Sequence, residues 1–169
     1  GEVEYTRASG VGTGRAKRRT ATGVAWDEAG RIGVNARAEL VYAEADLQAR
    51  ARRDTLEDGV ILTAPDTVFF AHDTVIGRDA IVEQNVVFAN GVTVESNARI
   101  RAFSHLEGCH VSQGATVGPY ARLRPGAELQ EDVHSGNFVE VKKSIIATGA
   151  KVNHLTYIGD ADIGARANI

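Results

Sequence analysis

The sequence predicts a mainly β protein, in which a parallel β-helix of hexapeptide repeats follows one α-helix and an irregular N-terminal arm. An apolar residue recurs at every sixth position from Phe70 onward, small residues often follow four places later, and only 6% of residues are aromatic. A period of six matches neither a helix nor a free-standing strand. It matches a triangular prism in which each hexapeptide forms one short strand and one corner, and stacked coils share a single narrow core.

The repeat runs to the last residue with three shortened steps, after Leu106, Val141 and Ile158, and with one polar interruption at Ser135. A coincidental pattern in a β-sandwich would not persist over so many positions, so the prism is favoured. The apolar positions are Phe70, Ile76, Val82, Phe88, Val94, Ile100, Leu106, Val111, Val117, Leu123, Leu129, Val141, Ile146, Val152, Ile158, Ile163 and Ile169.

Three segments precede or make up this repeat. Residues 1–33 are rich in Gly, Thr, Ala and Arg without a sustained period, which predicts an irregular, flexible arm. Residues 34–60 predict a linker helix, and residues 61–169 the β-helix domain, which we expect to be truncated at its C-terminal end.

The predicted helix has a start signal, a stop signal and one thin apolar stripe. Asn35 is a plausible N-cap, and Gly59 a natural terminator because it accepts a left-handed backbone. The stripe consists of Leu40, Ala43, Leu47 and Ala51.

Composition excludes several classes of protein. A net charge of -3 gives no reason to expect a nucleic-acid or membrane partner, and no apolar run is long enough to span a bilayer. The single cysteine, Cys109, excludes an intrachain disulfide and a multi-cysteine zinc site, and it is expected to be a small buried filler. We expect a cytoplasmic protein. Because the chain lacks methionine and begins with Gly1, we also expect a fragment of a longer one.

Several longer strings carry a resemblance to a known family. The strings VNARAEL, SHLEG, GPYARLRPGAEL, GNFVEVKKS and NHLTYIGDADIG resemble the bifunctional bacterial N-acetylglucosamine-1-phosphate uridyltransferase/glucosamine-1-phosphate N-acetyltransferase. The resemblance covers roughly residues 32–169. It implies that the β-helix is left-handed, against the usual right-handed crossover, and that the longer enzyme supplies UDP-N-acetylglucosamine for peptidoglycan and lipopolysaccharide synthesis.

The resemblance also implies a reaction and its residues. Acetyl-CoA would donate an acetyl group to the amine of glucosamine 1-phosphate in a direct attack, with His154 as general base. A histidine suits this role because its reference pKa of about 6.5 lets it accept a proton near neutral pH. Arg124, Lys142, Tyr157 and Asn168 match the family's sugar and phosphate contacts. Spacings of 18 and 15 residues place Arg124, Lys142 and Tyr157 near one edge.

Other parts of the family pattern are expected outside this chain. The residues that bind acetyl-CoA would follow Ile169, and the uridyltransferase domain with its magnesium ligands would precede Gly1. The family implies a homotrimer whose sites lie between subunits. We therefore expect this chain alone to have little or no acetyltransferase activity.

Two alternatives remain open at this stage. A γ-carbonic-anhydrase-like zinc enzyme shares the prism and uses three histidines, and this chain has five: His72, His105, His110, His134 and His154. Their neighbours do not resemble that family's motif, so no metal site is expected among them. The second alternative is a non-catalytic β-solenoid that scaffolds or assembles.

Overall fold

The computed structural model describes residues 37–169, so the predicted arm and the Asn35 cap lie outside the described residues. Val41–Ile169 form one compact unit, which contains most of the helix and every strand among the described residues. The helix is α2 (Arg37–Glu57), and a short 3-10 helix, η2 (Pro65–Thr67), follows the first strand. No helix among the described residues is long and apolar enough to cross a membrane.

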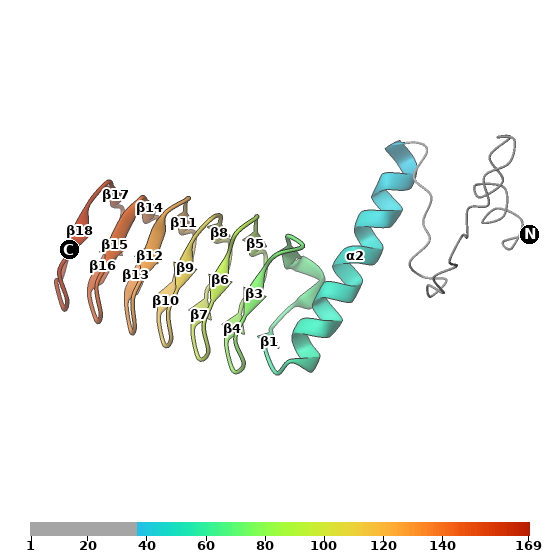
Figure 1. Cartoon of the computed structure of the whole chain (residues 1–169), viewed down its shortest axis with the longest axis horizontal. Coiled ribbons are helices and arrows are strands. Elements are labelled where there is room, and N and C mark those ends of the chain that lie inside the picture. Colours follow the sequence, from blue (N-terminus) through green and yellow to red (C-terminus); the bar gives the residue numbers. More distant parts are fainter. Residues whose placement is uncertain (1–36) are drawn as a thin grey trace, which may run out of the picture. The chain divides into compact units, whose positions relative to one another are not determined.

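Eighteen short strands follow α2 and stack as successive coils (Figure 1). They are β1 (Ile61–Leu62), β2 (Phe69–Phe70), β3 (Val75–Ile76), β4 (Ile81–Val82), β5 (Val87–Phe88), β6 (Thr93–Val94), β7 (Arg99–Ile100), β8 (His105–Leu106), β9 (His110–Val111), β10 (Thr116–Val117), β11 (Arg122–Leu123), β12 (Ala127–Leu129), β13 (His134–Asn137), β14 (Glu140–Lys142), β15 (Ser144–Ile146), β16 (Lys151–His154), β17 (Tyr157–Gly159) and β18 (Asp162–Ile163).

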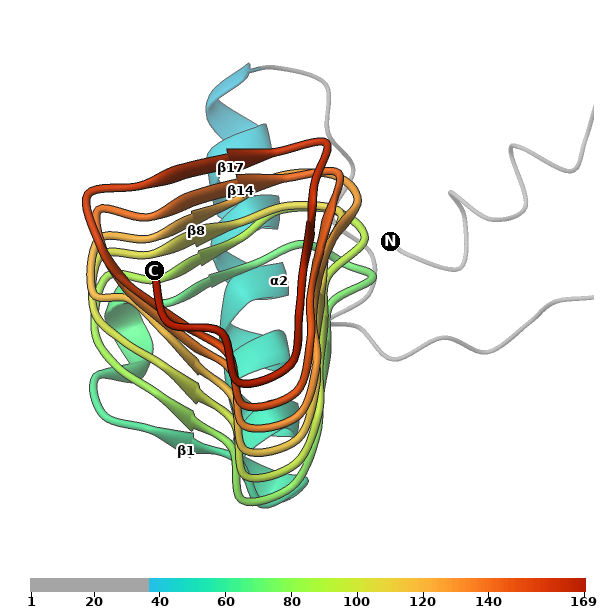
Figure 2. The same ribbon diagram turned by 90° about the vertical axis from the view of Figure 1, so that its left-hand side faces the viewer.

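The strands form three parallel sheets of six strands, each taking every third strand of the chain. Sheet A has the order β1-β4-β7-β10-β13-β16, sheet B the order β2-β5-β8-β11-β14-β17, and sheet C the order β3-β6-β9-β12-β15-β18. Seen from the C-terminal end, the chain runs clockwise around a triangle as it approaches the viewer, so the coil is left-handed (Figure 2). The prediction of a left-handed β-helix is confirmed, with six coils.

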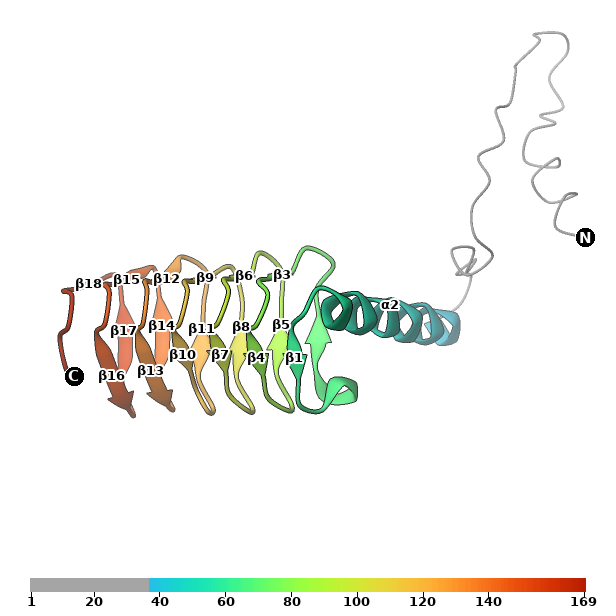
Figure 3. The same cartoon turned by 90° about the horizontal axis from the view of Figure 1, so that it is seen from below.

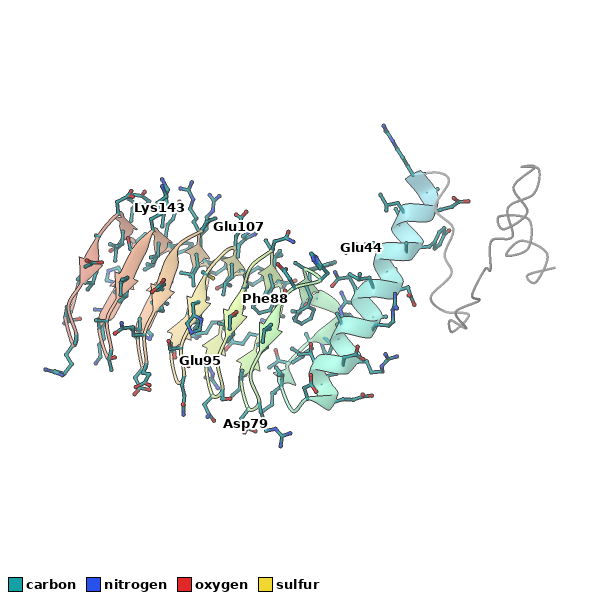
Figure 4. The ribbon with its side chains drawn as sticks, in the orientation of Figure 1. Glu44, Asp79, Phe88, Glu95, Glu107 and Lys143 are labelled. Atoms are coloured by element: carbon teal, nitrogen blue, oxygen red, sulfur yellow. The ribbon has the colours of Figure 1, made fainter. Side chains whose placement is uncertain are left out.

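The predicted apolar positions fill the axis of the prism. Phe88, Leu106, Leu123 and nearly all the others are buried, and Figure 4 shows Phe88 directed into the coils. The dropped residues leave the register intact, because Leu123 pairs with Leu106 on one side and with Val141 on the other. The period therefore determines which side chains point inward and which remain on the three outer faces.

The corners need left-handed backbone conformations, and most are supplied by residues that tolerate them. Asp79, Asn97 and Asp132 have φ near +60°, and so do glycines such as Gly91 and Gly149. The edge between sheets A and B is different, because from the third coil onward it carries large apolar residues in this conformation: Phe103, Tyr120, Phe138 and Leu155.

Helix α2 covers the first coil through a polar residue rather than through the predicted stripe. Gln48 is its one buried residue. The Gln48 amide nitrogen donates to the carbonyl of Phe70 at 2.7 Å, and its oxygen accepts from the Phe70 N–H at 2.9 Å. Strand β2 lies at the edge of sheet B and has a neighbouring strand on one side only. The two bonds from Gln48 satisfy the Phe70 backbone groups that a second neighbouring strand would otherwise satisfy.

The predicted stripe is wrong at Leu40, which is 58% exposed, whereas Ala51 packs against the core. The predicted terminator is confirmed. Gly59 has φ +89°, and the N–H of Val60 returns to the carbonyl of Thr55, which closes the end of the helix.

Candidate functional site

Two predicted phosphate ligands lie on the outer face of sheet B, in successive coils. Arg124 directly follows β11 and Lys142 ends β14, and these strands pair in parallel. Both residues follow a buried inward residue, Leu123 or Val141, so the alternation of the strand turns them outward. The chain thus places two fixed positive charges side by side on one face.

Arg124 is held in place by a carboxylate that the sequence did not single out. Its guanidinium Nη1 donates to Glu140 Oε1 at 2.9 Å, and the two side chains are only 35% and 34% exposed. Since Glu140 lies in the next coil at the register of Arg122, the pair crosses the face diagonally. A partly buried, charge-assisted bond of this kind orients the remaining N–H groups of Arg124.

Tyr157 brings its hydroxyl to the same column of residues. In register it pairs with Glu140, whereas Lys142 pairs with Gly159. A side chain at Gly159 would overlap the Tyr157 hydroxyl, so the phenol ring lies over this glycine, which is the register partner of Lys142. The structure therefore gathers Arg124, Lys142 and the Tyr157 hydroxyl on sheet B, although the side chains start from two different columns.

His154 lies around the corner from this group. It is the last residue of β16 in sheet A, and the corner residue Leu155, with φ +52°, separates it from sheet B. Its ring is exposed, and its backbone carbonyl accepts a bond from Thr156 Oγ1 at 2.9 Å. The hydroxyl of Thr156 thereby fixes the backbone turn that carries the histidine over the edge.

Asn168 belongs with His154 on sheet A and not with the sheet B group. It forms a parallel bridge with Lys151 of β16, and its side-chain oxygen accepts a bond from Asn153 Nδ2 at 2.8 Å. Figure 3 shows β16 beside β13 at this end of sheet A. The five predicted site residues thus fall into two sets, on two faces that share one edge.

That edge carries a stack of exposed rings, which we call the aromatic ladder: Phe103, Tyr120 and Phe138. The rings of Phe103 and Tyr120 have centroids 4.9 Å apart and lie 3° from parallel, and those of Tyr120 and Phe138 are 5.2 Å apart. All three side chains are about half exposed. Sequence reasoning missed the ladder, although the spacings of 17 and 18 residues match one full coil and could have revealed it.

The other residues with reactive or metal-binding side chains are Cys109 and the histidines. Burial raises the pKa of the Cys109 thiol to about 12, so it stays protonated and is a poor nucleophile, in agreement with the predicted buried filler. The five histidines are distributed over different strands and corners, and nowhere in residues 37–169 do three metal-binding side chains converge.

A cleft of about 380 Å³ lies between α2 and the first coil, lined in part by Arg50, Asp54 and His72. None of the predicted site residues lines it. They lie instead from the fourth coil to the start of the seventh, on open faces of the prism, so a ligand there would gain an enclosing wall from further protein.

The comparisons with known proteins agree with the repeat and the quoted strings. A model described as "Bacterial transferase hexapeptide (six repeats)" matches residues 73–108. The "Bifunctional protein GlmU" of Jannaschia sp. (strain CCS1) is 65% identical over 150 residues, which is 89% of this chain and 33% of that protein. The chain is a relative of the bifunctional protein GlmU.

Other GlmU proteins match almost the whole chain. That of Ruegeria sp. (strain TM1040) is 63% identical over 167 residues, covering 99% of this chain and 35% of the relative. The chain thus spans about a third of the length of the GlmU relatives it matches. The resemblance predicted from the strings is confirmed.

A solved structure shares the fold at much lower identity. The acetyltransferase domain of PglB from Neisseria gonorrhoeae FA1090, in complex with acetyl coenzyme A, has a TM-score of 0.54 and 15% identity. The match covers 66% of this chain and 60% of that one. It agrees with the observed prism of stacked coils.

Proposed function

We propose that this chain is the acceptor-binding part of a glucosamine-1-phosphate N-acetyltransferase related to GlmU. The observation that carries the proposal is the grouping of Arg124, Lys142 and the Tyr157 hydroxyl on one face. A dianionic phosphate fits such a group, since a guanidinium binds phosphate oxygens through paired N–H bonds and an ammonium adds a point charge. Glu140 leaves several Arg124 N–H groups for this purpose.

The chemistry assigned to His154 is proton removal from the substrate amine. The amine attacks the thioester carbonyl carbon of acetyl-CoA, the C–N bond forms, and the C–S bond breaks to release CoA as thiolate. The proton lost by the attacking nitrogen passes to the imidazole and can then return to the thiolate. No acyl-enzyme is needed, which agrees with a Cys109 thiol that is buried and protonated.

We propose acetyl-CoA as the donor and a second activity in the longer protein. The resemblance implies a longer protein that would also make UDP-N-acetylglucosamine, with magnesium in its uridyltransferase domain. The printed name of the relatives, "Bifunctional protein GlmU", supports a second activity in such a protein. Acetyl-CoA as donor is supported by the PglB domain that shares the fold and binds it.

We further propose that three copies meet along the aromatic ladder. A corner of a triangular prism is acute, so three corners around one axis leave three clefts between them. Each cleft would be lined by sheet A of one copy and sheet B of the next. His154 and Asn168 of one copy would then face Arg124, Lys142 and Tyr157 of another, which accounts for their division between two faces.

Acceptor binding tests the proposed function directly. Calorimetry on the 169-residue chain should detect glucosamine 1-phosphate, and Arg124→Ala or Lys142→Ala should weaken binding about tenfold or more. Arg78→Ala removes an equal charge from an exposed position outside the group and serves as the matched control. Unchanged binding in the Arg124 and Lys142 variants would favour a non-catalytic solenoid.

A further inference from the structure

A pair of asparagine amides joins the last two coils of sheet A, beside the proposed base. Asn153 immediately precedes His154 in β16, and Asn168 lies in the following coil. Asn153 Nδ2 donates to Asn168 Oδ1 at 2.8 Å and to the Ile169 carbonyl at 3.2 Å. Both hydrogens of the Asn153 amide are therefore engaged within the protein.

These bonds fix which end of each amide faces outward. An isolated Asn amide can turn over with almost no change of shape, exchanging a donor for an acceptor. Because Asn168 Oδ1 accepts from Asn153, its Nδ2 keeps two hydrogens for other partners. Within residues 37–169, neither Asn168 Nδ2 nor Asn153 Oδ1 has a partner. One donor and one acceptor thus lie side by side on an exposed surface.

We propose that Asn153 is a positioning residue, which fixes the Asn168 amide so that the pair recognises neighbouring substituents of the acceptor's sugar ring. The inference rests on the proposed function. A hydroxyl oxygen of the sugar accepts from Asn168 Nδ2, and an adjacent hydroxyl or amine hydrogen is donated to Asn153 Oδ1. Inorganic phosphate offers no such pair of substituents, so the asparagines select the sugar while sheet B holds the phosphate.

A purely structural role is the competing explanation, since side-chain amides also stabilise stacked coils. Asn153→Asp separates the two roles. A carboxylate cannot donate to Asn168 Oδ1, but it can accept from Asn168 Nδ2, so the bond between coils persists while the Asn168 amide turns over. The chain should stay folded, and the outward donor should be lost.

The test is calorimetry on the 169-residue chain with glucosamine 1-phosphate and, separately, inorganic phosphate. We expect Asn153→Asp and Asn153→Ala each to raise the Kd for glucosamine 1-phosphate by about three- to tenfold, which is the effect of losing one hydrogen bond. Binding of inorganic phosphate should change less than about twofold in the neutral Asn153→Ala variant. Thr116→Ala, on the outer face of sheet A two coils before β16, is the matched neutral control and should bind as the parent chain does.

A second measurement reports on the hydrogen bonding of the Asn168 side-chain amide. In ¹⁵N NMR spectra the Asn168 side-chain NH₂ should exchange rapidly with water in the parent chain and be slowed in Asn153→Asp, where it bonds to the carboxylate. If the parent chain binds glucosamine 1-phosphate and both Asn153 variants bind it equally well, the positioning role is wrong. A parent chain that does not bind glucosamine 1-phosphate would instead overturn the proposed function, and this inference with it.

Discussion

At the scale of single residues, one polar side chain interrupts the column of apolar core residues and lowers the free energy of unfolding. Ser135 is fully buried between Val117 and Val152 of the neighbouring coils, and its hydroxyl has no hydrogen-bond partner. Ser135→Ala removes that hydroxyl and leaves the packing almost unchanged. We expect the free energy of unfolding to rise by about 1 kcal/mol, measured from urea denaturation.

Ser144 is the matched control for this prediction. Its side chain is also buried, but its hydroxyl has two partners. It donates to the Lys142 carbonyl at 2.8 Å and accepts from the Ala161 N–H at 3.1 Å. Ser144→Ala should therefore destabilise the chain by about 1–2 kcal/mol. Equal changes in the two variants would show that the Ser135 hydroxyl does find a partner in solution.

At the scale of elements, the helix protects the open end of the solenoid by imitating a strand. Gln48 is the residue that does so, through its two bonds to the backbone of Phe70. Gln48→Ala should lower the urea midpoint, with a loss of about 2 kcal/mol, because a buried N–H and a buried carbonyl lose their partners. Val41→Ala, at an exposed position of α2, should have a much smaller effect. A similar loss in both variants would mean that the whole helix, not the amide, protects the edge.

The coil next to the candidate site depends on close backbone approach at one glycine. A Cβ at Gly136 would overlap the carbonyl oxygen of Asn153, whereas a Cβ at Gly164 would meet nothing within 4 Å. Gly136→Ala should destabilise the chain by about 2 kcal/mol or more and disturb the strand that carries His154. Gly164→Ala should be close to neutral, and thermal unfolding of both variants decides between these outcomes.

At the scale of the whole molecule, the sequence predicts the coils but not their surface. The six-residue period identifies which side chains point inward, because an apolar residue such as Leu123 or Val141 has no other place in a narrow prism. It does not identify the partner of an outward residue. The Arg124–Glu140 pair runs diagonally between coils, and Gln48 looks like an ordinary exposed helix residue until its edge strand is known.

The aromatic ladder is the feature of the whole molecule that most needs a partner. Three large side chains adopt a left-handed backbone conformation that costs roughly 1 kcal/mol or more each, and all three remain half exposed. Within one chain the rings stack on one another, which offsets part of this cost. Burial against the ladders of two further copies would add a hydrophobic gain along the entire edge.

Asparagine substitution tests this without endangering the fold. Asn accepts the left-handed conformation readily. A triple variant, Phe103→Asn, Tyr120→Asn, Phe138→Asn, should therefore fold, and its monomer should be at least as stable to unfolding as a single parent chain. Sedimentation equilibrium should show trimers for the parent chain and monomers for the variant. Val75→Asn, which removes an exposed apolar side chain from sheet C, should still form trimers. Trimers that persist in the triple variant would place the contact between copies on another edge, and His154 would then have to meet the phosphate group within one chain.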